Sequence, residues 1–416
     1  MLGCGPVRRP LGLRDGDAGR LLGRRRPIAN LRVANMKLTI ERVALLKALG
    51  HVQSVVERRN TIPILSNVLL RADSGGSGGG ALALSATDMD LEIVERVPAQ
   101  IERVGRITVP AHTLYDIVRK LPDGAQIEIE ASGERSTMVL RCGRSIFTLA
   151  CLPPEDYPVM ASGELEHHFT LTAAELKSLV DRTRFAISTE ETRYYLNGIY
   201  LHATKNDEVP VIRAVATDGH RLARVEMVLP EGAAGMPGVI VPRKTVLELR
   251  KLIDESDDDI QVELSETKIR FATGEATLTS KLIDGTFPDY DRVIPTTNDK
   301  VLEVKCKDFA EAVDRVSTIS TEKSRAVKLA IAPGSNGGSL AVSATSPENG
   351  TAIEELEVRY LSEPLEIGFN SRYLLDIAAQ IEGEGAQFVM SDSASPTIVR
   401  DRADPSALYV LMPMRV

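Results

Sequence analysis

Two short stretches of the chain carry side chains that could act in catalysis. Ser320 precedes Lys323 by three residues, the Ser-x-x-Lys spacing of serine acylases, and Asp218 with His220 could supply a carboxylate and an imidazole. The first stretch lacks the SDN and KTG companions of that signature. The second consists of neighbours in sequence, which rarely converge on one reacting atom, so a polar turn between strands explains it better. We therefore predict no catalytic residue.

Metal ligands and cofactor-binding loops are equally sparse. The adjacent His167 and His168 would need further ligands, and nothing near them in the sequence has ligand spacing. The four cysteines show no CxxC spacing and fit buried, reduced thiols of a cytoplasmic protein. The sequence contains no GxxxxGK[ST] loop, no GxGxxG and no HExxH. We predict no metal, no cofactor and no enzyme activity.

Composition argues against a membrane protein and sets the first 35 residues apart. No apolar run approaches the roughly 18 residues that a bilayer span needs. Residues 1–35 contain eight arginines against two aspartates, a net charge of +6, which leaves 42 basic and 56 acidic residues for the rest. We expect Met36 to be the natural start and the leader to be an upstream mis-start or a disordered arm.

The chain repeats itself three times at a period of about 130 residues. SATD at residues 85–88 returns as VATD at 215–218 and as SATS at 343–346, so successive threonines lie 130 and 128 residues apart. This period far exceeds the roughly 20 to 50 residues of solenoid repeats, so each copy should have its own core. After the leader at 1–35, the predicted domains are 36–162, 163–296 and 297–416.

Each copy is predicted to contain two helices and several antiparallel strands. Leu45, Leu49 and Val52 step by four and three residues, the spacing of one apolar helix face, and similar stripes recur in the other copies. Alternating runs such as 126–130 and 261–264 are typical of half-buried strands. The predicted fold class is α+β, with the helices packed on antiparallel sheets.

The predicted helices carry basic side chains although the chain as a whole is acidic. Lysines and arginines recur on their polar faces in all three copies, and Arg59, Arg119 and Arg243 are examples. If the helices face one way, they present a basic surface, which is typical of binding to a phosphate backbone. Ordinary solvated charges explain any single helix as well, so both interpretations stay open.

Four longer stretches resemble one protein family. They are RYYLNG at 193–198, ATDGHRLA at 216–223, FPDY at 287–290 and YVLMPMR at 409–415. In this order and spacing they resemble the bacterial DNA polymerase III β subunits, the sliding clamps. The similarity runs from Met36 to Val416 and leaves residues 1–35 outside.

This resemblance implies a DNA clamp fold and a function. Two three-domain chains would join head to tail as a closed ring, with helices inside and sheets outside. Such a cytoplasmic homodimer would encircle double-stranded DNA without reading its sequence and tether a polymerase as a processivity factor. Implied partners are the DNA polymerase III α subunit, an ATP-dependent clamp loader, and other polymerases and repair proteins with clamp-binding motifs. A hydrolase that uses Ser320 or His220 and a scaffold without DNA are the alternatives.

The resemblance also carries over two sets of site residues. Positions that match the family's DNA-facing inner surface are Arg59, Arg119, Arg193, Tyr194, Arg243 and Lys244. Positions that match its partner-peptide pocket between the second and third domains are Leu196, Thr217, Gly219, His220, Arg221, Leu222, Pro288, Arg292, Val293, Asn370, Tyr373, Val410, Met412, Pro413 and Met414. The apolar members would form an adaptable slot for a partner's Leu or Phe. His112 and Pro396 depart from the residues that relatives often carry.

Overall fold

One order of elements occurs three times along the chain: a strand, a helix, four strands, a second helix and three strands. The computed structural model describes residues 35–74, 80–132, 136–160, 163–254, 258–320, 325–334 and 337–415. The leader up to residue 34 and Lys323 lie outside these ranges. Within them, the predicted three-domain α+β organisation with two helices per domain is confirmed.

The first domain opens with β1 and α1 and closes with the β7–β8 hairpin. Its elements are β1 (Lys37–Glu41), α1 (Arg42–Val55), the 3₁₀ turn η1 (Pro63–Ser66), β2 (Asn67–Asp73), β3 (Gly80–Thr87), β4 (Leu91–Arg103), β5 (Gly105–Pro110), α2 (Ala111–Lys120), β6 (Gln126–Ser132), β7 (Thr137–Cys142) and β8 (Ser145–Ala150). The linker that follows contains η2 (Pro154–Asp156).

The second domain repeats this order and ends in a linker with a turn of its own. Its elements are β9 (His167–Thr172), α3 (Ala173–Arg184), η3 (Glu191–Leu196), β10 (Gly198–Asn206), β11 (Val209–Thr217), β12 (Arg221–Val228), β13 (Val239–Pro242), α4 (Arg243–Asp254), β14 (Asp259–Leu264), β15 (Lys268–Thr273) and β16 (Ala276–Lys281). Its linker contains η4 (Tyr290–Val293).

The third domain completes the series. Its elements are β17 (Lys300–Lys305), α5 (Cys306–Ser317), β18 (Ala326–Gly334), β19 (Gly337–Ser346), β20 (Gly350–Tyr360), β21 (Leu365–Asn370), α6 (Ser371–Ala378), β22 (Gly385–Met390), β23 (Thr397–Asp401) and β24 (Ala407–Leu411). By position in the repeat, β20 therefore corresponds to β4 and β12, and β24 to β8 and β16.

The helices form where the apolar spacing predicted them. Leu45, Leu49 and Val52 of α1 are fully buried against the strands of the first domain. At the start of α3, the Thr172 hydroxyl accepts a hydrogen bond from the backbone N–H of Glu175 at 3.2 Å, and the Glu175 carboxylate accepts one from the backbone N–H of Thr172 at 2.8 Å. This reciprocal cap satisfies two N–H groups that a helix start leaves unpaired.

Each boundary between domains is crossed by a pair of antiparallel strands. At the first joint, β4 of the first domain pairs with β16 of the second, and at the second joint β12 pairs with β24 of the third. The strands therefore form two sheets of twelve strands, each shared between two domains. Continuous backbone hydrogen bonding across both joints holds the three domains in a fixed relation.

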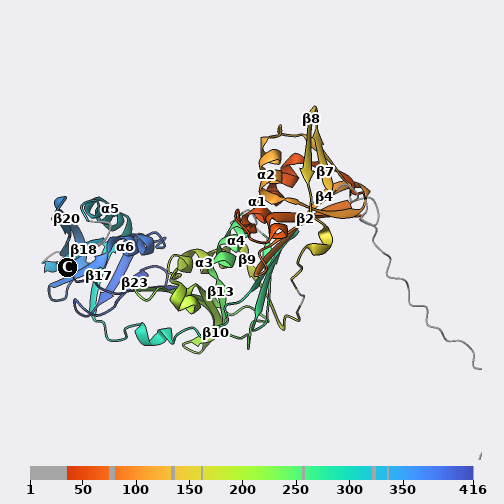
Figure 1. Cartoon of the computed structure of the whole chain (residues 1–416). Coiled ribbons are helices and arrows are strands. Elements are labelled where there is room, and N and C mark those ends of the chain that lie inside the picture. The colour runs from red at the N-terminus through yellow and green to blue at the C-terminus, as the bar shows by residue number, and fades with distance from the viewer. Residues whose placement is uncertain are drawn as a thin grey trace, which may run out of the picture.

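The chain forms an open arc with the helices on its concave edge. In Figure 1, α2, α1, α4, α3, α6 and α5 follow this edge, and strands form the opposite side. The last strand of the first domain, β8, and the β20 strand of the third lie at opposite ends of the arc. In the described part of the chain, no helix is long and apolar enough to cross a membrane.

Candidate functional site

The TDGHR stretch forms a tight turn between β11 and β12. The Asp218 Oδ1 accepts hydrogen bonds from the backbone N–H groups of His220 and Arg221 at 2.9 and 3.0 Å, and the Thr217 hydroxyl donates to the Arg221 carbonyl at 2.7 Å. Gly219 lies at φ +88°, a conformation that favours glycine. The carboxylate is thus occupied by the turn, and His220 is exposed. The prediction of a polar turn is confirmed.

The strands of the second joint bring this turn beside the C-terminal residues. Leu222 lies opposite Val410 in the β12–β24 pair, and the Met412 N–H donates to the His220 carbonyl at 2.9 Å. The Met414 N–H donates to the carbonyl of Gly368 at 2.8 Å, which carries the last residues across the third domain. Residues about 190 apart in sequence therefore share one surface.

A small hydrophobic core lies beneath that surface, separate from the main core. Its buried members are Leu196, Val215, Leu222, Ile240, Phe287, Tyr290 and Val410. Three predicted pocket residues, Leu196, Leu222 and Val410, are at most 4% exposed, so they build the floor of the site. The large apolar residues of the predicted set that are exposed are Met412 and Val293, at 41% and 49%. An exposed methionine can adapt to different apolar side chains.

The resemblance implies that Arg221 belongs to the partner-peptide pocket. In the structure its side chain lies largely buried at the joint between the second and third domains. Its side chain, 9% exposed, donates to Asp218 at 3.1 Å, to Asp376 at 2.5 Å and to the Phe185 carbonyl at 2.6 Å. Its guanidinium also lies 4.3 Å from the ring centroid of Tyr373. Arg221 and Tyr373 therefore hold α6 of the third domain against the second.

The remaining predicted pocket residues come from the third domain and from the linker before it. One of them caps a helix, and the others lie at or near the surface. The Asn370 side chain accepts a hydrogen bond from the Arg372 N–H at 3.0 Å and so caps α6. Of the linker residues, Pro288 and Arg292 are exposed, and Arg292 pairs with Asp289 at 2.7 Å. Pro413 follows Met412 at the rim, half-buried.

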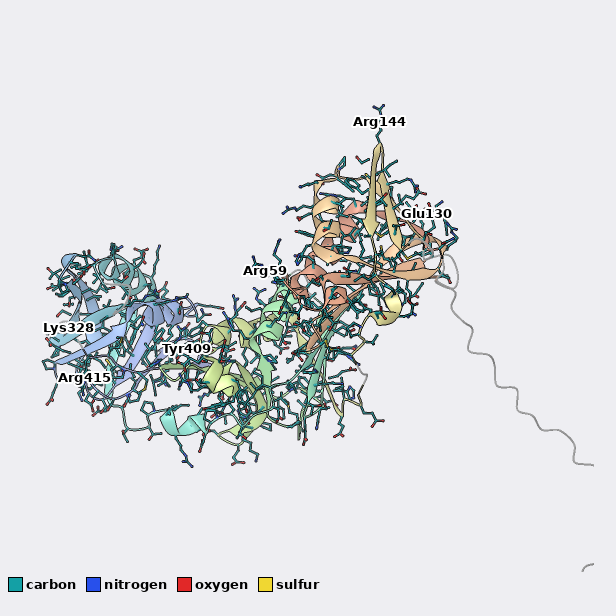
Figure 2. The ribbon with its side chains drawn as sticks, viewed as in Figure 1. Arg59, Glu130, Arg144, Lys328, Tyr409 and Arg415 are labelled. Carbon is teal, nitrogen blue, oxygen red and sulfur yellow. The ribbon has the colours of Figure 1, made fainter. Side chains whose placement is uncertain are left out.

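The predicted DNA-facing residues lie at helix ends and at η3. Arg59 follows α1 on the concave side of the arc (Figure 2). Arg119 lies in the last turn of α2 with its side chain 56% exposed, and Arg243 begins α4 and is exposed. Lys244 is different, because it donates to the Val55 carbonyl at 3.1 Å and pairs with Asp88. It is a contact of the first joint.

Arg193 and Tyr194 lie on η3, between the helices and the peptide surface. Arg193 makes two hydrogen bonds to Glu190, at 2.6 and 2.8 Å, and one to the Asp218 carbonyl at 3.0 Å. The Arg193 guanidinium lowers the pKa of the Glu190 carboxyl below its ordinary value. Tyr194 is 53% exposed. The pair thus offers one aromatic face and a guanidinium that already has a partner.

Nothing in the described ranges assembles a catalytic or metal centre from the other candidates. The Ser320 hydroxyl donates to the Ser317 carbonyl at 2.7 Å, and the described residues hold no cluster of three metal-ligating side chains. Cys142, Cys151 and Cys306 are buried and unpaired, and burial raises the pKa of the Cys151 thiol to about 11. A cavity of about 900 Å³ between β17 and β20 lies away from both residue sets.

Comparison with known proteins gives the same assignment along the whole chain after the leader. Family models for the N-terminal, central and C-terminal domains of the DNA polymerase III β subunit match residues 36–161, 170–289 and 291–415. The chain belongs to the DNA polymerase III β subunit family. The family is non-catalytic and acts in processivity, so the chain is a processivity clamp and not an enzyme.

Individual relatives are similar over nearly the entire chain. The β sliding clamps of Caulobacter vibrioides and Escherichia coli K12 are 57% and 41% identical to it, and each match covers 92% of this chain and 100% of the relative. The crystal structure of a Bartonella birtlesii sliding clamp bound to griselimycin has 54% identity and a TM-score of 0.87, over 92% of this chain and 100% of that one.

Several structurally important residues escaped the sequence analysis. Arg182 pairs with Asp404 at 2.8 Å across the second joint, and Arg213 pairs with Glu226 at 2.8 Å inside the second domain. In sequence these residues look like ordinary surface charges on a helix and on strands. Only the position of Arg213 inside an apolar run, residues 211–216, which is buried throughout, could have suggested an internal ion pair.

Proposed function

We propose that two copies of this chain join head to tail into a closed ring that encircles double-stranded DNA. The observation that supports it is a pair of matching strand edges. In the pairing of the described residues, β8 has β7 as its partner, and residues 350–358 of β20 have β19. The strands at the same places in the repeat, β4 with β16 and β12 with β24, form the two internal joints. A third joint between β20 and β8 follows from the repeat.

A single chain cannot make this third joint, because β8 and β20 lie at opposite ends of the arc (Figure 1). Two copies can make it twice, which closes a ring and leaves no edge for a filament. Such a dimer would have a mass of about 90 kDa, twice the 45.2 kDa of one chain. The helices on the concave edge would then line the hole.

The internal joints also predict the register of the third. At the first joint Ala276, the first residue of β16, lies opposite Glu95, and at the second Ala407, the first residue of β24, lies opposite Val225. The corresponding first residue of β8 is Ser145, and it would lie opposite Glu354 of the second copy.

This register brings two exposed isoleucines together. Ile146 follows Ser145 and would face Ile353 of the second copy, and these side chains are 66% and 69% exposed in the single chain. Burial of both would remove apolar surface from water at each of the two interfaces. In Figure 2, Arg144 projects from the tip of the same hairpin, at the end of the arc.

Light scattering tests the ring, and DNA retention tests its topology. We expect wild type to elute as a dimer and Ile146→Asp or Ile353→Asp as a monomer, while Val228→Asp, at a residue 75% exposed outside the joints, should stay dimeric. The dimer, loaded on nicked circular DNA by a clamp loader with ATP, should be lost when the circle is cut. Equal retention on circular and linear DNA would contradict encirclement.

The concave residues would contact phosphates without reading bases. Arg119 and Arg243 are exposed at helix ends and Arg59 is exposed shortly after α1, where they could follow the DNA backbone, and Tyr194 with Arg193 could continue this path. Weak, salt-sensitive contacts between this lining and the DNA would let the ring slide. The polymerase α subunit, the clamp loader and other polymerases and repair proteins are the proposed partners, in the cytoplasm. We place the domain boundaries at 162/163 and 296/297.

The surface between the second and third domains is the proposed partner-peptide site. Buried Leu196, Leu222 and Val410 form its floor, and exposed His220 and Met412 form its rim, which suits an extended segment with Leu or Phe anchors. A fluorescein-labelled peptide with an adjacent Leu–Phe pair should bind wild type and bind a His220→Ala, Met412→Ala double variant much more weakly. Griselimycin should compete with it. Equal peptide binding by both proteins would contradict the site.

A further inference from the structure

A chain of polar side chains lies buried under the linker between the second and third domains. Arg213 of β11 and Glu226 of β12 form an ion pair at 2.8 Å, and both side chains are 7% exposed. The Arg213 Nη1 donates to the hydroxyl oxygen of Tyr290 at 2.9 Å. That hydroxyl lies 2.9 Å from the His202 Nε2 on β10. Since the tyrosine oxygen accepts from arginine, its own proton is available for a neutral imidazole.

We propose that this network positions the linker as one wall of the peptide site, so that Tyr290, Arg213, Glu226 and His202 are positioning residues for partner binding. The proposal rests on the proposed function of that site. It adds four residues that would not touch the partner.

Besides the network, the linker is attached at this point by the ring of Phe287 and by a longer ion pair of 3.9 Å between Arg213 and the exposed Asp291. Of residues 284–293, only Phe287 and Tyr290 are buried, and they alternate with the exposed Pro288, Arg292 and Val293. Phe287 stacks on Tyr200 with ring centroids 4.9 Å apart and planes at 7°. This stacking holds one end of the turn. The hydroxyl of Tyr290 holds the other end, next to the residues that face a partner.

The network is costly to bury unless every group is paired. Removing an arginine and a glutamate from water carries a desolvation penalty that the ion pair offsets only with good geometry and further hydrogen bonds. Asn206 also donates to the Glu226 carboxylate, and Arg213 donates to Tyr290. A buried ion pair can fix one arrangement among several, because each alternative leaves a charge unpaired. Here the fixed arrangement is that of the linker.

His202 is kept in the form that can accept the tyrosine proton. Burial and the neighbouring Arg213 charge lower the pKa of His202 below its ordinary value, against smaller opposing effects from a hydrogen bond with the Ala203 backbone and from Asp291. The neutral ring also stacks on Tyr200, with centroids 4.6 Å apart. A neutral imidazole therefore suits both contacts.

The first linker provides a matched contrast. Tyr157, which follows η2, is 6% exposed, and its hydroxyl donates to the Ser85 carbonyl at 3.0 Å. The hydrogen-bond partners of this hydroxyl in the described part of the chain are two backbone carbonyls, those of Ser85 and Asn67, and the residue lies next to no proposed partner site. Tyr157→Phe is therefore a control that removes the same atom at the corresponding place.

The decisive variant is Tyr290→Phe, which keeps the ring and removes only the hydroxyl. The probe is the fluorescein-labelled Leu–Phe peptide, and its binding is followed by stopped-flow anisotropy. If the linker of this variant spends only about a tenth of the time in the position that binds the peptide, the association rate falls about tenfold while the dissociation rate changes less than about twofold. Val293→Ala, which removes a proposed direct contact, should instead raise the dissociation rate.

Two further measurements separate positioning from a general loss of structure. Hydrogen exchange of the amides in residues 283–294 should become faster in Tyr290→Phe, while that of β10 and β11 stays at its wild-type value. His202→Gln keeps a hydrogen-bond acceptor and should retain most of the association rate, whereas His202→Leu should lose it. Tyr157→Phe should leave peptide binding unchanged.

Several outcomes would overturn the proposal. An unchanged association rate in Tyr290→Phe, or a loss confined to the dissociation rate, would show that the hydroxyl does not position the linker. If wild type binds neither the peptide nor griselimycin, the proposed site itself fails, and this role fails with it. If wild type binds and Tyr290→Phe binds equally, only the positioning role fails.

Discussion

The two internal joints share a backbone design and differ in their side chains. At the first, the Lys281 N–H donates to the Asp90 carbonyl at 2.8 Å, and at the second the Met412 N–H donates to the His220 carbonyl at 2.9 Å. Above the first hydrogen bond, the Lys281 and Asp90 side chains form an ion pair at 2.9 Å. Above the second, methionine and histidine are exposed, with no such ion pair between them.

The side chains that lie beneath these two hydrogen bonds are polar at the first joint and apolar at the second. Leu222 lies opposite Val410 at the second joint, and at the corresponding pair of the first, Glu92 lies opposite Thr279. An apolar floor can take a partner's Leu or Phe, whereas a carboxylate and a hydroxyl cannot. The repeat thus supplies the same frame twice, and a few substitutions reserve one copy for partners. This explains why the proposed peptide site occurs once per chain.

The helices at the two joints are also held differently. At the first, the Ser54 hydroxyl of α1 donates to Glu248 of α4, and Lys244 of α4 pairs with Asp88 of the first domain. At the second, one arginine, Arg221, makes hydrogen bonds to Asp376 and to the Phe185 carbonyl. The polar side-chain contacts of these helices therefore come from a serine and a lysine at the first joint, and from two arginines at the second, because Arg182 also pairs with Asp404 at 2.8 Å.

Substituting the central cation of each joint should separate them most clearly. Arg221→Met leaves two carboxylates without their buried partner and should lower the free energy of unfolding by about 3 kcal/mol. Lys244→Met removes a pair whose lysine is 38% exposed, and should cost about 1 kcal/mol or less. Calorimetry measures both, and hydrogen exchange of α6 should rise only in Arg221→Met. Equal losses would mean that the second joint depends on Arg221 no more than the first depends on Lys244.

A smaller difference is expected from the turns that precede the two joints. Gly219 has φ +88°, and a Cβ there would lie 2.5 Å from the Arg193 Nη1, while Met89 holds the corresponding place at φ +80°. Gly219→Ala should cost about 1 to 2 kcal/mol, and Met89→Gly should be neutral or stabilising by a few tenths. Thermal denaturation of the two variants measures this. A stabilised Gly219→Ala would show that the turn tolerates a side chain.

The sequence predicted the frame of the molecule better than its joints. The 130-residue period and the apolar stripe of Leu45, Leu49 and Val52 gave three domains with two helices each, because repetition and periodicity are local signals. The resemblance placed His220 and Met412 on one surface. It could not show that Arg221 is buried in the joint or that Tyr290 anchors a linker, because those roles depend on which charged side chains meet across about 80 to 160 residues of sequence.

The smallest expected effect is a pH dependence of opposite sign at the two joints. At the first, burial raises the pKa of Glu92 above its ordinary 4.5, despite a hydrogen bond from the Met160 backbone and the Arg270 charge. At the second, burial would raise the pKa of Asp404, but hydrogen bonds from Ser406 and the Arg182 charge lower it overall below 3.8. Folding therefore disfavours the ionised form of Glu92 and favours the ionised form of Asp404.

The signs follow from these directions. Ionised Glu92 destabilises the fold at neutral pH, and this penalty disappears as the pH falls through its raised pKa to 4.5, so Glu92→Gln should be more stable than wild type at pH 7 and equal to it below 4.5. Asp404 contributes stability in full above pH 3.8 and loses it below, so Asp404→Asn should be less stable at pH 7, with the gap closing in acid. Shifts of about 1 to 3 °C in melting temperature are expected. Calorimetry from pH 7 to pH 3 measures these shifts. The comparison between the joints would be contradicted if the melting temperatures of both variants shifted in the same direction at pH 7.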